Sequence, residues 1–469
     1  MPHLDAAPAV FSAHEIAAII GQKLASADFS VNGFSTDTRT IEAGNCFIAL
    51  KGESFNGNLY AKTAVEKGAV LCILTEQPQE DIGAPFLLVE DAVKTYGMLA
   101  NAYIARLKAN GAKIVAVTGS SGKTTVKNMT AHVLAKKFRT YSTQGNHNNH
   151  IGLPFTILHT PADTQILVLE MGMNHKGEIS NLTKIGCPDL AIITNIGKAH
   201  IGNLGSQENI FRAKLEIVEG MDVQNGRLVL PADDEFLANT EKIPFAAENV
   251  LYSSRDPQGN SKAVLCADNI AEGSDNLRFC VHFDGASAEV LLPMTGVHNV
   301  TDALLAMHAG LTCGMSLAEC AEALADFVPT ALRSDRVQHG NVTIIRDFYN
   351  ANPEAMICSL NGLKLAANGA KMTALLGNMN ELGDHAPQAH KAIGAYCKEQ
   401  GVQALFCGVN FRDFAEGFGD ASAAFETQAE LIAELPKLFP VSETTFVLIK
   451  ASRGLAMEHV YDALAEILK

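Results

Sequence analysis

A short glycine-rich stretch, TGSSGKTT at residues 118–125, combines the residue types that bind nucleotide phosphates. Its glycines let backbone N–H groups close round phosphate oxygens, the Lys123 ammonium would reach the β- and γ-phosphates, and the Thr124 hydroxyl would ligate Mg²⁺. Only two residues separate the two glycines, so the loop is shorter than the usual phosphate-loop pattern. The alternative is a GKT triplet in an ordinary turn. We assign nucleotide binding to the loop residues Gly119, Ser120, Ser121, Gly122, Lys123, Thr124 and Thr125.

The segments around this loop are those that a phosphate site needs. Residues 114–118 form an apolar, β-branched run that predicts a strand, and Val126, Met129, Val133 and Leu134 follow the loop at helical spacing. A strand that leads through glycines into a helix places the helix N-terminus, with its positive potential, against the phosphates. The setting therefore favours a nucleotide site over a chance turn.

Two more polar residues follow predicted strands. Glu170 ends the run ILVLE, and His200 comes shortly after LAIITNI. In an open parallel sheet, ligands bind outside the carboxyl ends of the strands, so both side chains could face the phosphate loop. A carboxylate oxygen suits Mg²⁺. His200 alone fits a packed or surface histidine equally well.

A lysine occupies an unexpected place in the stretch NIFRAKLEIVEGM, residues 209–221. As a helix, this stretch has one broad apolar face, and Lys214 falls near its middle while Glu216 points away. Ser206 is the expected N-cap. A lysine in apolar surroundings has a lowered pKa, and its neutral amine can react with CO₂ to give a carbamate, an oxygen ligand for Mg²⁺. The alternative is a side chain that reaches along the helix to solvent.

Short apolar runs alternate with helix-like segments along most of the chain, as in KIVAVT, ILVLEMG, LAIITNI, VTIIRD, MTALLG, ALFCGV and TFVLIK. Continuous apolar strands separated by helices predict buried parallel sheets and an α/β fold. The first hundred residues look more mixed. Two polar links, 105–113 and 327–341, are candidate boundaries, and 469 residues suit two to four domains.

The net charge and the cysteine pattern limit the kinds of binding partner and cell compartment that we expect. Net charge is −15, and no lysine- or arginine-rich run is present, which argues against nucleic acid or an anionic membrane as the main partner. The ten cysteines show no CxxC pair, a pattern typical of reduced thiols in a cytoplasmic protein. The N-terminal stretch lacks the basic region of a signal peptide, and no apolar run approaches the ~20 residues that span a bilayer.

Ten motifs in order along the chain resemble the Mur ligases, which are ATP-dependent enzymes that add amino acids to the UDP-N-acetylmuramoyl peptide precursor of peptidoglycan. The resemblance covers nearly the whole chain. Its motifs are STDTRTIEAGNCFIALKGESFNGNLYA, TGSSGKTT, TQGNHNNHIGLP, LEMGMNHKGEI, TNIGKAHIGNLGS, RAKLEI, GVHNVTDALLA, RDFYNANPEAM, GNMNELGDHA and KASRGLAME.

The strings LEMGMNHKGEI and YNANP are similar to those of the family member that joins D-alanyl-D-alanine to UDP-N-acetylmuramoyl-tripeptide. The resemblance implies that reaction, by way of an acyl phosphate, in a cytoplasmic protein that we expect to be a monomer. It also implies three domains: 1–108 binding the UDP-muramoyl substrate, a central phosphate-loop ATPase domain over 109–329, and a Rossmann-like domain over 330–469 that closes on ATP and binds the dipeptide.

The resemblance also carries residue roles. It implies that Thr124 and Glu170 hold one Mg²⁺, that His200 and a carbamylated Lys214 help to hold a second, and that Lys123, Lys214 and His200 are catalytic. ATP would further contact Asn299, Arg333, Asp347 and Asn350. The substrates would contact Thr38, Arg39, Asn148, Asn149, Lys450, Ser452 and Arg453.

Three alternatives are consistent with parts of this pattern. A sister amide ligase, such as one adding glutamate to folate, would share the ATPase core without the NNHIG and YNANP strings. A phosphate-loop switch or kinase would bind nucleotide without an amine substrate. A non-catalytic relative would have lost metal ligands, whereas all four predicted ones are present.

Overall fold

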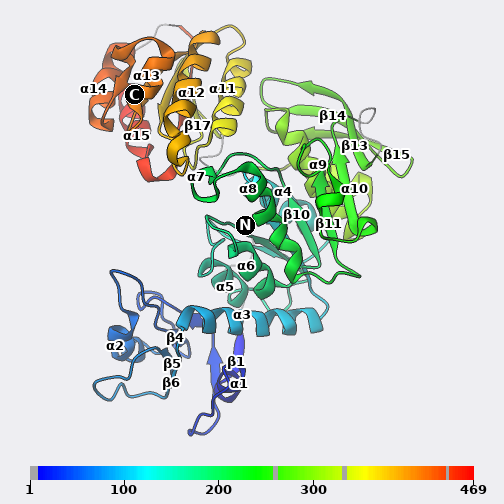
Figure 1. Cartoon of the computed structure of the whole chain (residues 1–469), viewed down its shortest axis with the longest axis vertical. Coiled ribbons are helices and arrows are strands. Elements are labelled where there is room, and N and C mark those ends of the chain that lie inside the picture. Colours follow the sequence, from blue (N-terminus) through cyan, green and yellow to red (C-terminus); the bar gives the residue numbers. More distant parts are fainter. Residues whose placement is uncertain (1–8, 257–261, 330–334, 440–442) are drawn as a thin grey trace.

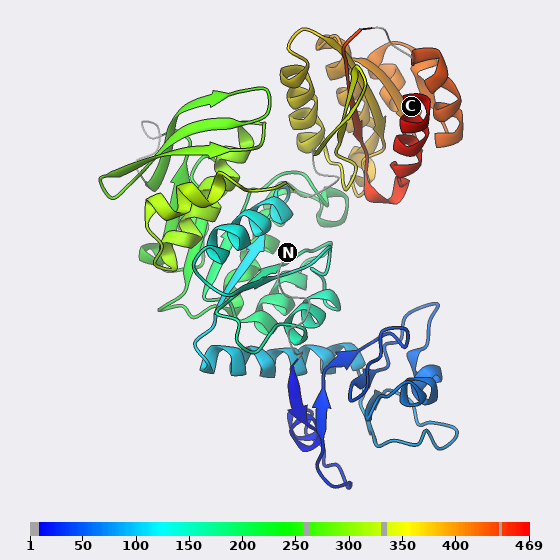
Figure 2. The ribbon, with the colours of Figure 1, turned by 180° about the vertical axis from the view of Figure 1, so that it is seen from behind.

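The computed structural model describes residues 9–256, 262–329, 335–439 and 443–469, which fold into three α/β parts (Figure 1). The N-terminal and C-terminal parts lie at opposite ends of the molecule, with the phosphate-loop part between them (Figure 2). The predicted α/β fold with mostly parallel sheets is confirmed.

The N-terminal part holds two small sheets. An antiparallel pair joins β1 to β2, and a parallel four-stranded sheet has the order β3-β4-β5-β6. A long helix, α3, ends this part and packs under α5 and α6 of the central part (Figure 1). The elements are β1 (Val10–Ser12), α1 (Ala13–Ile19), β2 (Ser30–Asn32), β3 (Phe34–Ser35), β4 (Cys46–Ile48), η1 (Gly57–Tyr60), α2 (Ala61–Glu66), β5 (Leu71–Leu74), β6 (Phe86–Leu88) and α3 (Ala92–Ala109).

A nine-stranded sheet forms the middle of the molecule, in the order β15-β14-β13-β12-β11-β10-β7-β9-β8. Strands β8 to β13 pair in parallel, and β13, β14 and β15 pair in antiparallel fashion. The strands are β7 (Lys113–Thr118), β8 (Thr140–Ser142), β9 (Ile166–Glu170), β10 (Leu190–Ile193), β11 (Arg227–Pro231), β12 (Val250–Ser254), β13 (Ala263–Glu272), β14 (Leu277–Phe283) and β15 (Ala286–Leu292).

Helices cover both faces of this sheet, which explains why its central strands are apolar throughout. In β7, Ile114 and Ala116 join one core, while Val115 and Val117 join the other, because successive side chains of a strand point to opposite faces. The helices are α4 (Lys123–Ala135), α5 (Gly152–Leu158), α6 (Glu178–Gly186), α7 (Ile201–Leu204), α8 (Gln207–Leu215), η2 (Glu216–Gly220), η3 (Thr240–Lys242), η4 (Ala247–Asn249), α9 (His298–Thr312) and α10 (Leu317–Leu324).

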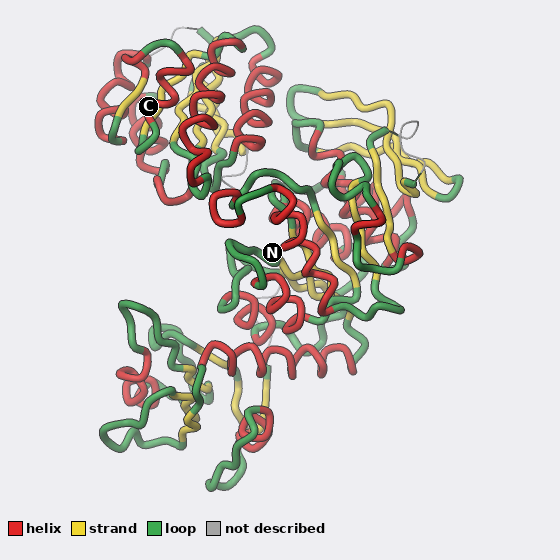
Figure 3. Tube along the Cα trace, viewed as in Figure 1, coloured by secondary structure: helices red, strands yellow, loops and turns green. Residues whose placement is uncertain are grey.

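The C-terminal part is a six-stranded sheet with helices on its faces (Figure 3) and its own core. The order is β16-β17-β21-β18-β19-β20, parallel except for the pair β16 and β17. Its elements are β16 (Asp335–His339), β17 (Val342–Arg346), α11 (Pro353–Ala367), β18 (Lys371–Gly377), η5 (Gly383–His385), α12 (Ala386–Glu399), β19 (Gln403–Cys407), α13 (Phe411–Phe418), η6 (Ala421–Ala423), β20 (Ala424–Phe425), α14 (Gln428–Leu438), β21 (Thr445–Lys450), η7 (Arg453–Leu455) and α15 (Glu458–Ile467).

The helix expected over residues 209–221 ends early. Its N-cap is Ser206, whose hydroxyl accepts from the Asn209 N–H as predicted, but the α-helix stops at Leu215 and continues as a 3₁₀ turn. Among the described residues, no helix has the length and apolar character needed to cross a bilayer.

Candidate active site

One large cleft, about 1130 Å³, lies where the central and C-terminal parts face each other. The phosphate loop, the ends of β9 and β10 and the start of α9 line one side. Residues from the end of β17 and the start of α11, together with Glu381 and Lys450, line the other. The carboxyl ends of the central strands therefore open onto this cleft, where ligands bind in parallel α/β sheets.

The phosphate loop has the predicted strand–loop–helix form. Gly119 adopts φ 149°, and a Cβ there would stand 1.8 Å from Thr194 Oγ1, so only glycine fits the close approach of β10. Helix α4 begins at Lys123, which leaves its first N–H groups facing the cleft. The Lys123 ammonium donates to the carbonyls of Gly119 (2.8 Å) and Ser120 (3.3 Å) and so lies over the loop.

Thr124 and Glu170, both predicted as metal ligands, meet beside the loop. The Thr124 hydroxyl donates to Glu170 Oε2 at 2.8 Å, and the Asn148 side-chain amide donates to Oε1 at 2.8 Å. Glu170 is only 2% exposed. A hydroxyl oxygen and a carboxylate oxygen therefore lie 2.8 Å apart in the lining of the cleft, and both are donors of the kind that Mg²⁺ prefers.

His200 also lines the cleft, but its partner comes from the C-terminal part. Its Nδ1 lies 2.6 Å from Glu381 Oε2, and this ion pair holds the pKa of the Glu381 carboxyl below its ordinary value. Both residues have left-handed backbone angles, φ 65° and φ 66°, which non-glycine residues seldom adopt. Such strain occurs chiefly at functional sites.

Lys214 is buried, with 1% of its surface exposed. Burial, assisted by the nearby charge of Lys123, holds the pKa of the Lys214 ammonium well below its ordinary value. Within the described residues no hydrogen bond or ion pair of Lys214 is found, so the alternative of a side chain reaching solvent is wrong. Lys214 is not among the residues that line the cleft, but it lies close enough to Lys123 for the two charges to interact.

The orientation expected for Glu216 is wrong. Where the helix tightens to a 3₁₀ turn, this side chain becomes buried, and its carboxylate accepts from the N–H groups of Gly177 (2.9 and 3.0 Å) and Ser180 (3.2 Å). These groups belong to the first turn of α6, whose positive end a carboxylate stabilises. The apolar face of residues 209–221 is otherwise buried as predicted.

On α9, the predicted Asn299 and an unpredicted Asp302 both line the cleft. The Asn299 amide donates to the Thr295 carbonyl at 2.6 Å. A Cβ at Gly122 would lie 3.1 Å from the Asp302 carboxylate, so this acid packs against the phosphate loop. Burial raises the pKa of Asp302 to about 8. Its helical spacing from Asn299 was the only signal in the sequence.

In the C-terminal part, three predicted residues come together at the cleft. The Lys450 ammonium, 3% exposed, donates to Asp347 Oδ2 (2.7 Å) and to the Asn350 carbonyl (3.1 Å). Lys450 is thus anchored to the two residues expected to contact ATP. Arg333, predicted for the same role, lies outside the described residues.

Ser452 and Arg453, which follow β21, are not on the cleft wall. The Ser452 hydroxyl accepts from the Asn380 N–H at 2.9 Å, which ties two loops of the C-terminal part together. The Arg453 guanidinium pairs with Glu458 on α15.

Asn148 and Asn149 line the cleft, whereas Thr38 and Arg39 lie in the N-terminal part. Asn149 Oδ1 accepts from the N–H groups of Ile151 (3.1 Å) and Gly152 (2.9 Å) at the start of α5. The Arg39 side chain is 85% exposed and pairs with Asp37 at 2.6 Å. The Thr38 carbonyl accepts from the Lys67 ammonium.

Contacts between the central and C-terminal parts were not foreseen from the sequence. The Asn352 amide donates to the Ser121 hydroxyl at 2.8 Å, which joins the start of α11 to the phosphate loop. The Gly202 N–H donates to the Glu381 carbonyl at 3.1 Å. These contacts join residues about 180 to 230 positions apart, a separation at which local sequence patterns carry no signal.

Two family models match the chain. The Mur ligase middle domain matches residues 117–310, and the Mur ligase glutamate ligase domain matches residues 332–453. Curated relatives share the full length: the chain is 34% identical to the UDP-N-acetylmuramoyl-tripeptide–D-alanyl-D-alanine ligase of Bacillus subtilis, over 93% of both chains. It is 32% identical to the ligase of that name from Escherichia coli, over 96% of this chain and 97% of the relative.

Solved structures agree. A crystal structure of MurF from Acinetobacter baumannii superposes with a TM-score of 0.88 at 29% identity, over 98% of this chain and 99% of the other. The structure of the MurF ligase of Thermotoga maritima in complex with ADP superposes with a TM-score of 0.79 at 26% identity, over 93% of this chain and 97% of the other. The chain belongs to the Mur ligase family and, within it, to the group of the UDP-N-acetylmuramoyl-tripeptide–D-alanyl-D-alanine ligases.

Proposed function

We propose that the protein is the ATP-dependent ligase that joins D-alanyl-D-alanine to UDP-N-acetylmuramoyl-tripeptide, giving the pentapeptide precursor of peptidoglycan. The observation that carries this function is the full-length similarity to ligases of that name. The cleft supports it chemically, because a phosphate loop, paired oxygen donors and a second part of the chain surround one cavity.

In the proposed reaction, the terminal carboxylate of the tripeptide attacks the γ-phosphorus of ATP, so that ADP leaves and an acyl phosphate forms. The dipeptide amine then attacks the acyl carbon and loses a proton, and the tetrahedral intermediate expels inorganic phosphate. Two anions must meet in the first step, so positive groups near the γ-phosphate lower its barrier. Lys123 and the N–H groups at the start of α4 are placed to supply them.

We propose that Thr124 and Glu170 hold a first Mg²⁺ and that His200 and a carbamate on Lys214 help to hold a second. The Thr124 hydroxyl and the Glu170 carboxylate are already in hydrogen-bond contact, and the burial of Lys214 favours the neutral amine, which attacks CO₂ and loses a proton to give the carbamate. Bound Mg²⁺ would neutralise charge on the phosphates, and the carbamate would give Lys214 a negative oxygen in place of a positive nitrogen.

The other ligand contacts are also proposals. We propose that ATP is bound by residues 119–125, Asn299, Arg333, Asp347 and Asn350. The proposed catalytic residues are Lys123, Lys214 and His200. Three anchored residues at the cleft, Asn148, Asn149 and Lys450, are assigned to the muramoyl peptide or the dipeptide. We assign the substrates also to Thr38, Arg39, Ser452 and Arg453, and divide the chain into domains 1–108, 109–329 and 330–469.

We further propose that the protein acts as a cytoplasmic monomer that binds neither nucleic acid nor membrane. The net charge of −15 supports the absence of an anionic partner, and all ten cysteines are free, as in a reducing compartment.

The function is tested by phosphate release from ATP in the presence of Mg²⁺, with each peptide substrate omitted in turn. We expect release only when UDP-N-acetylmuramoyl-tripeptide and D-alanyl-D-alanine are both present, with a product heavier by one dipeptide unit in mass spectrometry. Turnover that ignores the dipeptide would contradict the proposal and point to a sister ligase or a nucleotide switch.

A further inference from the structure

The antiparallel strands β13, β14 and β15 carry metal-binding side chains on their outer face. On the inner face, Leu265, Phe279, Val281 and Val290 are buried in the core shared with α9 and α10. Because side chains alternate along a strand, the residues between them point outward. An outer sheet face usually carries solvated polar residues. Here it carries thiols, an imidazole and carboxylates.

The strand register sets these side chains in two adjacent rows. Asp268 on β13 stands opposite Cys280 on β14, which stands opposite Glu289 on β15. In the next row, His282 stands opposite Ser287. Directly opposed side chains on one face have Cβ atoms only ~5 Å apart, so the register alone brings the donors within reach of one another.

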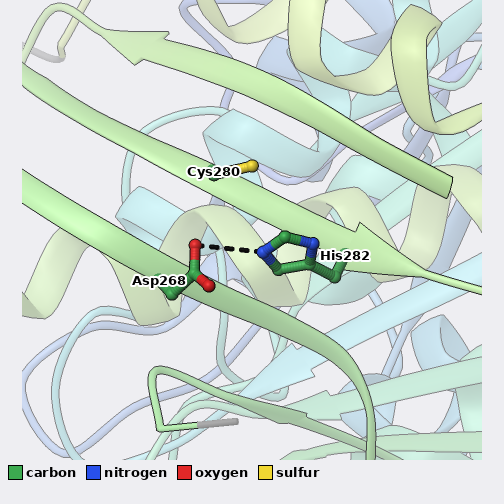
Figure 4. Close-up of side chains that lie close together, drawn as sticks. All are labelled: Asp268, Cys280 and His282. Atoms are coloured by element: carbon green, nitrogen blue, oxygen red, sulfur yellow. Dashed lines mark ion pairs between the residues drawn. The ribbon is translucent and has the colours of Figure 1, made fainter. Parts of the chain in front are cut away.

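The donor atoms are close enough to share one ion. One ligand atom from each of Asp268, Cys280 and His282 lies within 4.8 Å of the other two. Figure 4 shows the imidazole and the carboxylate pointing toward each other, with the thiol on the same side of the sheet. His282 Nε2 is 3.0 Å from Asp268 Oδ1.

The imidazole is oriented as in a metal ligand. Its Nδ1 lies 2.9 Å from Ser287 Oγ, and in the tautomer where Nδ1 donates this hydrogen bond, Nε2 presents a lone pair. That Nε2 is buried and makes no aligned hydrogen bond, although the carboxylate oxygen is close. In this tautomer the Nε2 lone pair faces the Asp268 carboxylate, and a cation bound between them would remove their repulsion. Metal-binding histidines have their other nitrogen held in the same way.

We propose that Asp268, Cys280 and His282 bind one divalent transition-metal ion, with Zn²⁺ as the best match to the donors. Zinc takes thiolate, imidazole and carboxylate ligands in a tetrahedron, and Glu289 or a water would complete it. Mg²⁺ prefers oxygen donors alone, so the site would select against the ion proposed for the cleft. None of the three residues lines the cleft.

The pairing of β13 with β14 is interrupted next to Asp268, which suggests what a bound ion would do there. The register of β13 and β14 shifts between Asp268 and Ala271, and Asn269 adopts φ 50°. A bulge of this kind re-aims a neighbouring side chain and weakens the ladder. A bound ion would cross-link β13 to β14 where their hydrogen-bonded pairing is interrupted. It would not take part in the reaction in the cleft.

The test uses the full-length protein, freed of metal and titrated with Co²⁺ as a spectroscopic substitute for Zn²⁺. We expect an intense thiolate-to-cobalt charge-transfer band that saturates at one Co²⁺ per chain when excess Mg²⁺ is present to occupy the proposed cleft sites. Cys280→Ser should abolish the band, and Asp268→Asn or His282→Gln should weaken Zn²⁺ binding at least ~10-fold. Cobalt in the cleft cannot give this band, since its proposed ligands include no thiol.

A second measurement needs no variant: bound Zn²⁺ should slow alkylation of Cys280 by iodoacetamide at least ~10-fold in the unaltered protein. Cys313→Ser, a change at the thiol that follows the end of α9, and Asp284→Asn, in the turn after β14, are matched controls that should keep the cobalt band. The proposal is overturned if the band is missing, if it survives Cys280→Ser, or if Zn²⁺ leaves the alkylation rate unchanged.

Discussion

At the scale of single residues, the proposed mechanism depends most on Lys214. The sequence placed this lysine on an apolar face, and the structure buries it beside Lys123, where the pKa of its ammonium is strongly lowered. An isolated buried ammonium costs several kcal/mol, so a structural role alone does not explain it. The proposed carbamate, with its negative charge balanced by a bound cation, would explain it.

We therefore expect Lys214→Ala to lower ligase turnover ~10²-fold or more, because the oxygen ligand disappears. Bicarbonate should not restore activity, whereas acetate, which brings a carboxylate to the space left by the side chain, should restore part of it. The check is kcat with and without acetate. Arg212→Ala, on the exposed side of the same helix, is the control and should keep near-normal turnover. Near-normal turnover of Lys214→Ala would refute the carbamate.

Asp302 gives a prediction about pH. Its folded pKa, about 8, is raised above the value of 3.8 expected in the unfolded chain, so the folded protein holds an extra proton between these values. Stability therefore falls as the pH rises from about 4 to about 8. Asp302→Asn removes this proton uptake.

The variant should be more thermostable than the unaltered protein at about pH 8, by on the order of 1 kcal/mol or more, with a smaller gain at about pH 5. Thermal midpoints at the two pH values provide the measurement. An equal gain or loss at both would show that the carboxyl does not titrate in this range.

At the scale of elements, the sequence predicted the strand–loop–helix around residues 114–134 because strand period, glycines and helix period all appear within 21 consecutive residues. It also gave the Ser206 cap, which depends on one side chain and a local N–H. The end of α8 at Leu215 was missed. Glu216 turns inward to reach α6, and that partner lies about 40 positions away in the chain.

This contact predicts the behaviour of Glu216→Ala. The variant leaves the N–H groups of Gly177 and Ser180 unpaired at the start of α6, so we expect a loss of about 1–2 kcal/mol of stability. Glu208→Ala, which removes ion pairs with the exposed side chains of Arg212 on α8 and Lys242 on η3, should cost less than about 0.5 kcal/mol. Chemical unfolding compares the two. Equal costs would mean that the Glu216 carboxylate does not stabilise the helix start.

At the scale of the whole molecule, the parallel strands and the helices that cover them were predictable. A strand that is apolar at every position must be covered on both faces of its sheet. The antiparallel strands β13 to β15 were not predicted, since their alternating pattern lies among polar residues. The contacts between the central and C-terminal parts could not be predicted from the sequence either. His200 faces Glu381 and Gly202 meets residues 381–383 only because two separate sheets pack against each other.

Gly202→Ala tests the contact between these parts. A Cβ there would stand 2.6 Å from the Gly383 nitrogen and 2.9 Å from the Glu381 carbonyl, so the C-terminal part must move away. We expect lower kcat and a larger radius of gyration by X-ray scattering. Gly52→Ala, where a Cβ meets nothing within 4 Å, should change neither. An unchanged radius and kcat for Gly202→Ala would mean that this contact does not hold the cleft together.

Ligation through an acyl phosphate is tested most directly by following an oxygen atom from the tripeptide carboxylate to the released phosphate. UDP-N-acetylmuramoyl-tripeptide labelled with ¹⁸O in its terminal carboxylate is incubated with ATP, Mg²⁺ and D-alanyl-D-alanine, and the released phosphate is analysed by mass spectrometry. Ligation through an acyl phosphate predicts one ¹⁸O per phosphate released, because the attacking carboxylate oxygen leaves with phosphorus. Phosphate without the label would contradict the account, since its oxygen would then come from water.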